Sequence, residues 1–154
     1  MKKTKWHGQA KGKEFEDRMC EQLDEAGIEY IREKVAHSKS TAKTTRGKFD
    51  LVIGNLCLEL KTTQAKSLAY ALYADDPRQN IKIKGHQVAA LYKNYYTFGK
   101  QAGLLLEYRP NKPVFVQIKD FLEFTSESKG KSLKHADALL IGKEIDSIKE
   151  IINV

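Results

Sequence analysis

The chain has few cysteines, fewer acidic than basic residues and no long apolar segment, and each shortage excludes a class of protein. Two cysteines among 154 residues are too few for a disulfide framework, so a reducing cytoplasm is the expected location. No apolar run approaches the roughly 18 residues that a membrane helix needs. The basic start of the chain is not followed by an apolar stretch, which argues against a secretory signal. We therefore expect a cytoplasmic protein with no membrane partner.

The surplus of basic residues is the most informative feature of the composition. Lys and Arg outnumber Asp and Glu by 27 to 20, which gives a formal net charge of +7. A nucleic acid is the natural partner for such a surface, although a solvated basic face is an equally good explanation of charge alone. The basic residues expected to contact DNA are Lys39, Lys43, Arg46, Lys48, Lys82, Lys84, His86, Lys129 and Lys131.

The apolar pattern predicts one mixed α/β domain with a central sheet. Residues 1–10 are expected to form a flexible basic arm and residues 11–154 the domain. Helical spacing is found at 12–26, 85–100, 119–127 and 143–154, and strand patterns at 28–36, 48–54, 56–62, 102–109 and 114–119. The segments 37–47, 64–84 and 128–135 are polar and predict loops.

A β-hairpin in the middle of the chain carries the candidate chemistry. Gly54 and Asn55 form a two-residue turn signal between two apolar segments. Counting back from this turn places Asp50 opposite Glu59, on one face and with Cβ atoms about 5 Å apart. Lys61 follows on the same face, because side chains alternate along a strand.

The alternation also predicts how the apolar side chains of this hairpin are divided. Along the second strand, the leucines occupy the face opposite Glu59 and Lys61. The residues predicted to share a face within each strand are Leu56, Leu58 and Leu60, and Phe49, Leu51 and Ile53.

Two carboxylates that face each other repel, so something positive is expected between them. A divalent cation with oxygen ligands is the obvious candidate, with Asp50 and Glu59 as its ligands. The Lys61 ammonium would position the attacking water or stabilise the charge of a phosphoryl transition state. The alternative is an exposed face on which Lys48 and Lys61 neutralise the two acids.

Other residues are expected to border this site. Glu16 lies beside the apolar stripe of the first helix and either points into the site or balances Lys13 in solvent. Gln87 begins the second long helix and either holds a water or phosphate or caps that helix. The tyrosines of this helix are expected in the core or on a dimer surface rather than as platforms for DNA bases; they are Tyr92, Tyr95 and Tyr96.

Asp50 followed by Glu59-Leu60-Lys61 resembles the PD-(D/E)xK nuclease signature. Within that superfamily the chain resembles the RecU-type Holliday junction resolvases. Residues 12–16 (GKEFE) are similar to the family's first helix. Residues 86–109 resemble its HQ helix, turn and strand, and residues 129–142 its basic C-terminal segment. The short segment between Asp50 and Glu59 and the small size of the chain point to a compact, phage-borne member.

The resemblance implies a restriction-endonuclease-like core and a homodimer that cuts four-way DNA junctions with Mg²⁺ or Mn²⁺. It matches Asp50 and Glu59 to the metal-binding carboxylates and Lys61 to the catalytic lysine. It further matches Glu16 and Gln87 to the remaining polar positions of the catalytic site. Thr44 and Thr45 lie where the family places polar residues that contact DNA.

Two other functions are compatible with the same residues. One is a restriction-like or repair nuclease that acts on other DNA substrates. The other is a nucleic-acid-binding module without catalysis, against which the complete set of Asp50, Glu59 and Lys61 argues.

Overall fold

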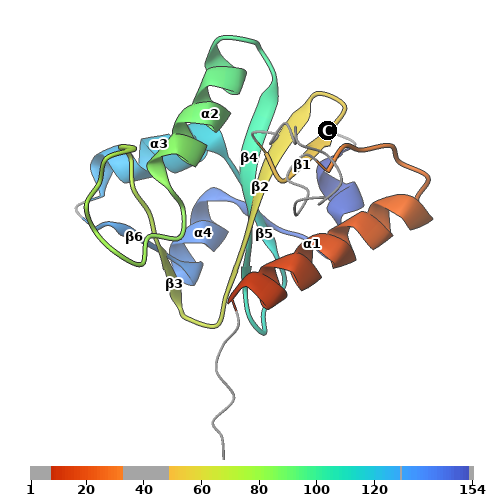
Figure 1. The fold of residues 1–154 in the computed structure, drawn as a ribbon, viewed down its shortest axis with the longest axis horizontal. Coiled ribbons are helices and arrows are strands. Elements are labelled where there is room, and N and C mark those ends of the chain that lie inside the picture. Colours follow the sequence, from red (N-terminus) through yellow and green to blue (C-terminus); the bar gives the residue numbers. More distant parts are fainter. Residues whose placement is uncertain (1–7, 33–48, 129, 153–154) are drawn as a thin grey trace, which may run out of the picture.

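The computed structural model describes residues 8–32, 49–128 and 130–152. Figure 1 shows the helices and strands of these segments. In chain order they are α1 (Gly8–Glu25), β1 (Leu51–Ile53), β2 (Leu56–Thr63), β3 (Ser67–Ala69), α2 (Gly85–Tyr96), β4 (Gln101–Tyr108), β5 (Val114–Gln117), α3 (Ile118–Glu127), β6 (Ser132–Lys134), α4 (His135–Ile141), β7 (Lys143–Glu144) and the 3-10 helix η1 (Ile148–Ile151).

A five-stranded mixed sheet in the order β1-β2-β4-β5-β7 forms the centre of the molecule. Strands β2 and β4 are parallel, and the other neighbouring strands are antiparallel. A separate two-stranded sheet joins β3 to β6. The predicted α/β fold, with a central mixed sheet between helices, is confirmed.

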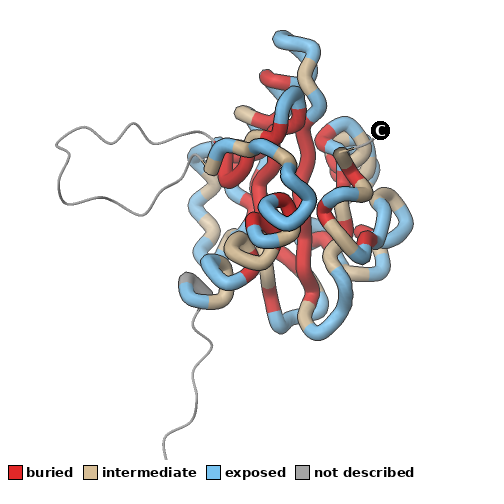
Figure 2. Tube along the Cα trace, turned by 90° about the vertical axis from the view of Figure 1, so that its right-hand side faces the viewer, coloured by how far each residue is buried: buried red, intermediate tan, exposed pale blue. Residues whose placement is uncertain are grey.

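Helices cover both faces of the central sheet, so the domain has two hydrophobic cores (Figure 1). On one face, α1 contributes Phe15, Met19 and Leu23, which pack with Leu58 and Leu105. On the other face lie α2, α3 and α4. The buried strands run between exposed helices and loops in Figure 2.

The spacing of apolar residues explains why α1 forms and where it ends. Phe15, Met19 and Leu23 are four residues apart, which places them on one side of a helix. The chain then reverses at Gly27, whose φ of +69° is in the left-handed region that favours glycine. The amide of Ile28 donates to the carbonyl of Leu23 over 2.9 Å and closes the helix end. Because α1 begins at Gly8, it includes three of the ten residues predicted as an arm.

Several predicted elements are wrong or shorter than predicted. Of the strand predicted at 28–36, the described part forms a single bridge between Ile31 and Val52. The polar segments 64–84 and 128–135, predicted as loops, contribute β3 and β6. The tail, predicted to be helical, contains β7 and one turn of 3-10 helix. Each of these short strands depends on pairing with a distant segment, which local periodicity does not encode.

One predicted face also needs correction. Phe49 packs in the core on the α2 side, whereas Leu51 and Ile53 pack on the α1 side. The cause is a bend at residues 49–50, which ends the alternation before Phe49. Along α2, Tyr92, Tyr95 and Tyr96 are exposed, so they do not lie in the core, and a dimer surface remains the prediction for them.

Within the described segments, none of the helices combines the length and the apolar character needed to cross a membrane.

Candidate metal centre and nucleic-acid interface

The predicted hairpin register is confirmed for residues 51–53 of β1, but the ladder ends before the predicted pair of Asp50 and Glu59. Ile53 pairs with Leu56, and Leu51 pairs with Leu58. At the next position the ladder stops: the Asp50 amide donates to the Leu58 carbonyl over 3.1 Å. The Asp50 carboxylate oxygen Oδ2 then accepts a hydrogen bond from the amide of Leu60 at 2.8 Å. The Asp50 side chain thus bonds the edge of β2 at the point where β1 has ended.

Glu59 lies in the middle of β2 and is completely buried. It shares the α2 face of the sheet with Cys57, because side chains two residues apart in a strand point the same way. The Gln87 amide nitrogen Nε2 donates to Glu59 Oε2 over 3.2 Å. The other end of the same amide, Oε1, accepts the backbone N–H of Lys84 at 3.1 Å. Gln87 therefore both caps the start of α2 and fastens it to Glu59.

Lys61 is the next residue of β2 on the face of Glu59, about 7 Å further along the strand. It is half-buried and pairs with Leu106 of the parallel strand β4. The leucines between these polar residues, Leu58 and Leu60, point into the opposite core. The strand thus directs its leucines toward α1, and Glu59 and Lys61 toward α2.

The donor chemistry of Asp50 and Glu59 fits a divalent cation. Both carboxylates are buried, with 7% and 0% exposure, and an ionised buried carboxylate needs a compensating charge. Mg²⁺ is usually held by one or two carboxylates together with waters and substrate phosphates. No cluster of three or more Asp, Glu, His or Cys that could hold a metal occurs within residues 8–32, 49–128 and 130–152. Asp50 and Glu59 could therefore supply two ligands to such a cation, and water and phosphate would have to supply the others.

Glu16 is held by a cation that the sequence did not suggest. Arg32 Nε donates to Glu16 at 3.2 Å, and Arg32 Nη1 donates to Asp17 at 2.8 Å. Hydrogen bonds from Lys13 and Arg32 lower the pKa of Asp17. Glu16 belongs to α1, which covers the sheet face opposite α2. Glu16 could therefore contact the site of Asp50 and Glu59 only around the edge of the sheet. Arg32 follows the bridge at Ile31, and no local pattern marks it.

Four of the predicted DNA contacts lie within the described segments, and all four are exposed: Lys82, Lys84, His86 and Lys131. Backbone hydrogen bonds place Lys131 and Lys82, which are far apart in the sequence, beside the end of β3. The Tyr70 amide donates to the Lys131 carbonyl at 3.0 Å, and the Lys82 amide donates to the Ala69 carbonyl at 2.9 Å. We call the surface formed by Lys82, Lys84, His86 and Lys131 the basic surface. The other predicted contacts lie outside the described residues: Lys39, Lys43, Thr44, Thr45, Arg46, Lys48 and Lys129.

The tyrosines of α2 form an exposed stripe rather than part of the core. Tyr92 and Tyr96 stack with ring centroids 5.4 Å apart and an angle of 13° between planes. Tyr95 lies in the same half of the helix, and all three rings are exposed to solvent.

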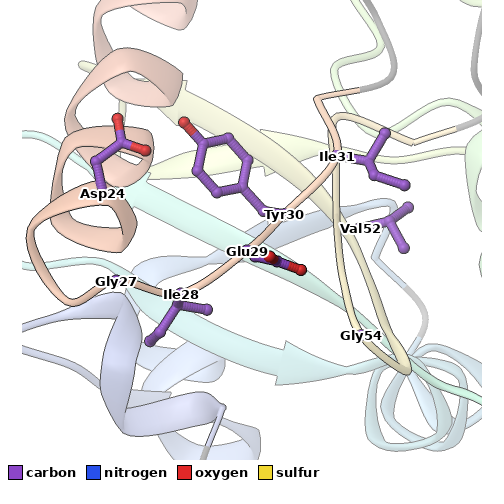
Figure 3. A pocket seen from close by; sticks show the side chains of 8 residues that line it. All are labelled: Asp24, Gly27, Ile28, Glu29, Tyr30, Ile31, Val52 and Gly54. Atoms are coloured by element: carbon purple, nitrogen blue, oxygen red, sulfur yellow. The ribbon is translucent and has the colours of Figure 1, made fainter.

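A hollow of about 790 Å³ lies beside the hairpin but lacks the character of a DNA site (Figure 3). It is lined by Asp24, by residues 27–31 and by Val52 and Gly54 of the hairpin. Its charged lining residues are the acids Asp24 and Glu29, which would repel phosphates. None of the predicted site residues lines it.

Comparison with known proteins finds a similar structure but no related sequence. No family model matches the chain, and no curated protein matches it. Among solved structures, it is similar to that of Archaeoglobus fulgidus Hjc, a Holliday junction resolvase from an archaeal hyperthermophile, with a TM-score of 0.55. The match covers 91% of this chain and 98% of the other, at 23% sequence identity. The chain therefore has the restriction-endonuclease-like fold of that protein.

Proposed function

We propose that the protein is a metal-dependent endodeoxyribonuclease that resolves four-way DNA junctions. The observation that carries the proposal is the pair of buried carboxylates, Asp50 directly before β1 and Glu59 in the adjacent strand β2, in a resolvase-like fold. The resemblance to RecU-type resolvases, and to a phage-borne member in particular, belongs to the same proposal. The unbridged Cys20 and Cys57 agree with the expected cytoplasmic location.

The roles of the residues follow from their positions. Asp50 and Glu59 would hold Mg²⁺ or Mn²⁺, which supplies Lewis acidity toward a phosphodiester and lowers the pKa of water. Gln87 positions the Glu59 carboxylate through its amide. The Lys61 ammonium, on the same face as Glu59, stabilises negative charge that develops on the phosphate. We assign Glu16 a supporting role at the sheet edge, where Arg32 holds it.

The basic surface would supply most of the affinity for DNA. Lys82 and Lys84 lie on the segment that leads into α2, His86 lies in the first turn of α2, and Lys131 lies directly before β6. Each lysine that neutralises a phosphate releases counterions, so binding should weaken steeply with salt. The predicted contacts outside the described residues would extend this surface.

A homodimer is part of the proposal, because symmetric cleavage of a junction needs two sites related by a twofold axis. The exposed stripe of Tyr92, Tyr95 and Tyr96 is the candidate surface for the second copy. Tyr96→Asp would place a charge in this surface, so sedimentation should show a dimer for the wild type and a monomer for the variant. A wild type that sediments only as a monomer at micromolar concentration would contradict the dimer.

The proposed activity can be tested on two DNA substrates of equal length. A synthetic four-way junction and a linear duplex are incubated with the protein and Mg²⁺, Mn²⁺ or EDTA. The proposal expects paired nicks across the junction, dependent on metal, and little cutting of the duplex. Equal cutting of both substrates would indicate a restriction-like or repair nuclease. Tight binding without cleavage under any metal would indicate a non-catalytic module.

A further inference from the structure

A second hollow, of about 320 Å³, opens beside the start of α2. Its walls combine an aromatic ring, an amide and cations, which is the set of groups that binds a nucleotide. Tyr73 is 70% exposed, and Asn80, Lys84 and His86 are also exposed. An exposed tyrosine offers a flat face on which a base can stack, and the Asn80 amide offers a donor and an acceptor for a base edge.

An ion pair holds the wall of this hollow in place. The Arg78 guanidinium donates to both carboxylate oxygens of Asp76, and the Arg78 amide donates to Asp76 Oδ1 at 3.0 Å. The Arg78 nitrogen Nη2 also donates to the Tyr70 carbonyl. These bonds lower the pKa of Asp76, so this acid stays ionised and paired with Arg78. Since Arg78 is paired with Asp76, Lys84 is the lysine of this hollow that can attract a phosphate.

The hollow is attached directly to the candidate metal centre. A Cβ at Gly85 would lie 2.2 Å from the Tyr73 carbonyl oxygen, so the backbone beside Tyr73 packs against the first residue of α2. Two residues further on, Gln87 donates to Glu59. The same helical turn therefore borders the hollow through Gly85 and His86 and contacts the metal centre through Gln87.

We propose that this hollow, which we call the Tyr73 subsite, binds one unstacked nucleotide of the DNA strand close to the bond that is cut. The proposal rests on the proposed nuclease function and deepens it. The Tyr73 ring stacks on the base, Asn80 faces its polar edge, and Lys84 attracts its phosphate. Regular duplex DNA keeps its bases stacked, so the subsite favours branched or bulged DNA, in which a base is released at little cost.

Binding of two matched duplexes without metal tests the subsite separately from catalysis. Both duplexes have the same sequence and carry a fluorophore, and one contains a single unpaired thymidine. Anisotropy titrations in EDTA compare the wild type with Tyr73→Ala and Tyr73→Phe, and Leu140→Ala serves as a control on an 82% exposed residue of α4. Stacking of the unpaired base on the Tyr73 ring is available only with the bulged duplex, so we expect the wild type to prefer that duplex about tenfold.

The variants decide the proposal. Tyr73→Ala should bind both duplexes with nearly equal affinity, whereas Tyr73→Phe and Leu140→Ala should keep the preference. An equal preference in Tyr73→Ala and wild type, or none in the wild type, would overturn the subsite. If Tyr73→Ala melts below the wild type, Tyr73→Leu, which lacks the ring but keeps apolar bulk, is the deciding variant and should also lose the preference.

Cleavage of the four-way junction, measured in parallel, separates the two proposals. If the wild type cuts the junction but the preference does not depend on Tyr73, only the subsite fails. If no DNA is cut with Mg²⁺ or Mn²⁺ but the preference is lost in Tyr73→Ala, the nuclease proposal fails and the subsite stands.

Discussion

Two buried glutamates on neighbouring strands, Glu59 of β2 and Glu107 of β4, have very different surroundings. Glu107 is 5% exposed and accepts hydrogen bonds from Arg18 at 2.6 Å, Arg109 at 2.9 Å and the Thr62 hydroxyl at 2.8 Å. Glu59 accepts the neutral amide of Gln87. The two carboxylates point to opposite faces of the same sheet. Glu107 pairs with Thr62 of β2, and Thr62 lies three residues after Glu59, so their side chains point to opposite sides of the strand.

The contrast separates a structural acid from a candidate functional one. Two permanently charged guanidiniums compensate Glu107, and such a network fixes strands and helix together. Glu59 instead lies directly before Leu60, whose amide donates to the Asp50 carboxylate. Two carboxylates beside one segment of a strand are the type of ligands that can bind a divalent cation.

The largest effect is expected for the acids of the metal centre. Glu59→Gln or Asp50→Asn should lower the cleavage rate of a four-way junction by at least about 10³-fold, because several kcal/mol of transition-state stabilisation are lost. Junction affinity in EDTA and the midpoint of unfolding should stay close to wild type. Full activity in either variant would remove that residue from the metal centre.

A smaller loss is expected for Lys61→Ala. Removing the ammonium should slow cleavage about 10²-fold, since one preorganised charge is lost from the transition state. The measurement is single-turnover cleavage beside the Kd for the junction. An unchanged rate constant with weaker binding would make Lys61 a DNA contact rather than part of the reaction.

Glu107→Gln should lower the stability of the protein and leave its cleavage rate almost unchanged, which is the opposite of the effect expected for Glu59→Gln. Glu107→Gln removes the buried carboxylate partner of Arg18 and Arg109, which keep their ion pairs with the exposed Glu14. The free energy of unfolding should therefore fall by about 1–3 kcal/mol, which urea denaturation can measure. The cleavage rate of the folded protein should stay within a few-fold of wild type. A variant of unchanged stability that cannot cut DNA would reverse the roles assigned to the two glutamates.

The smallest effects are expected on the basic surface. Lys82→Ala and Lys131→Ala should each weaken binding a few-fold on junction and duplex alike, and each should reduce the salt slope by about one. Affinity measured across a salt series checks this. A loss confined to one DNA structure would show that the lysine reads shape rather than charge alone.

The hairpin could be predicted from the sequence because its signals are local. A two-residue turn fixes the register, and the register places Asp50 near Glu59. The same reasoning failed at Phe49, because the bend that begins there follows from side-chain bonding of Asp50 to Leu60 rather than from strand alternation.

Other features depend on contacts between distant segments, and no short pattern encodes them. Arg32 meets Glu16, and Arg18 meets Glu107 across 89 residues. The strand pair β3-β6 joins two segments that are individually polar and irregular. The Tyr73 subsite exists only because the segment before α2 folds back onto Gly85.

Metal binding by the protein in the absence of DNA tests the central claim most directly. A calorimetric titration with Mn²⁺ compares the wild type, Glu59→Gln and Glu107→Gln, which remove one buried carboxylate each from opposite faces of the sheet. We predict saturable binding to the wild type and to Glu107→Gln, and loss of binding in Glu59→Gln. Equal Mn²⁺ binding by Glu59→Gln and the wild type would contradict the assignment of the metal centre.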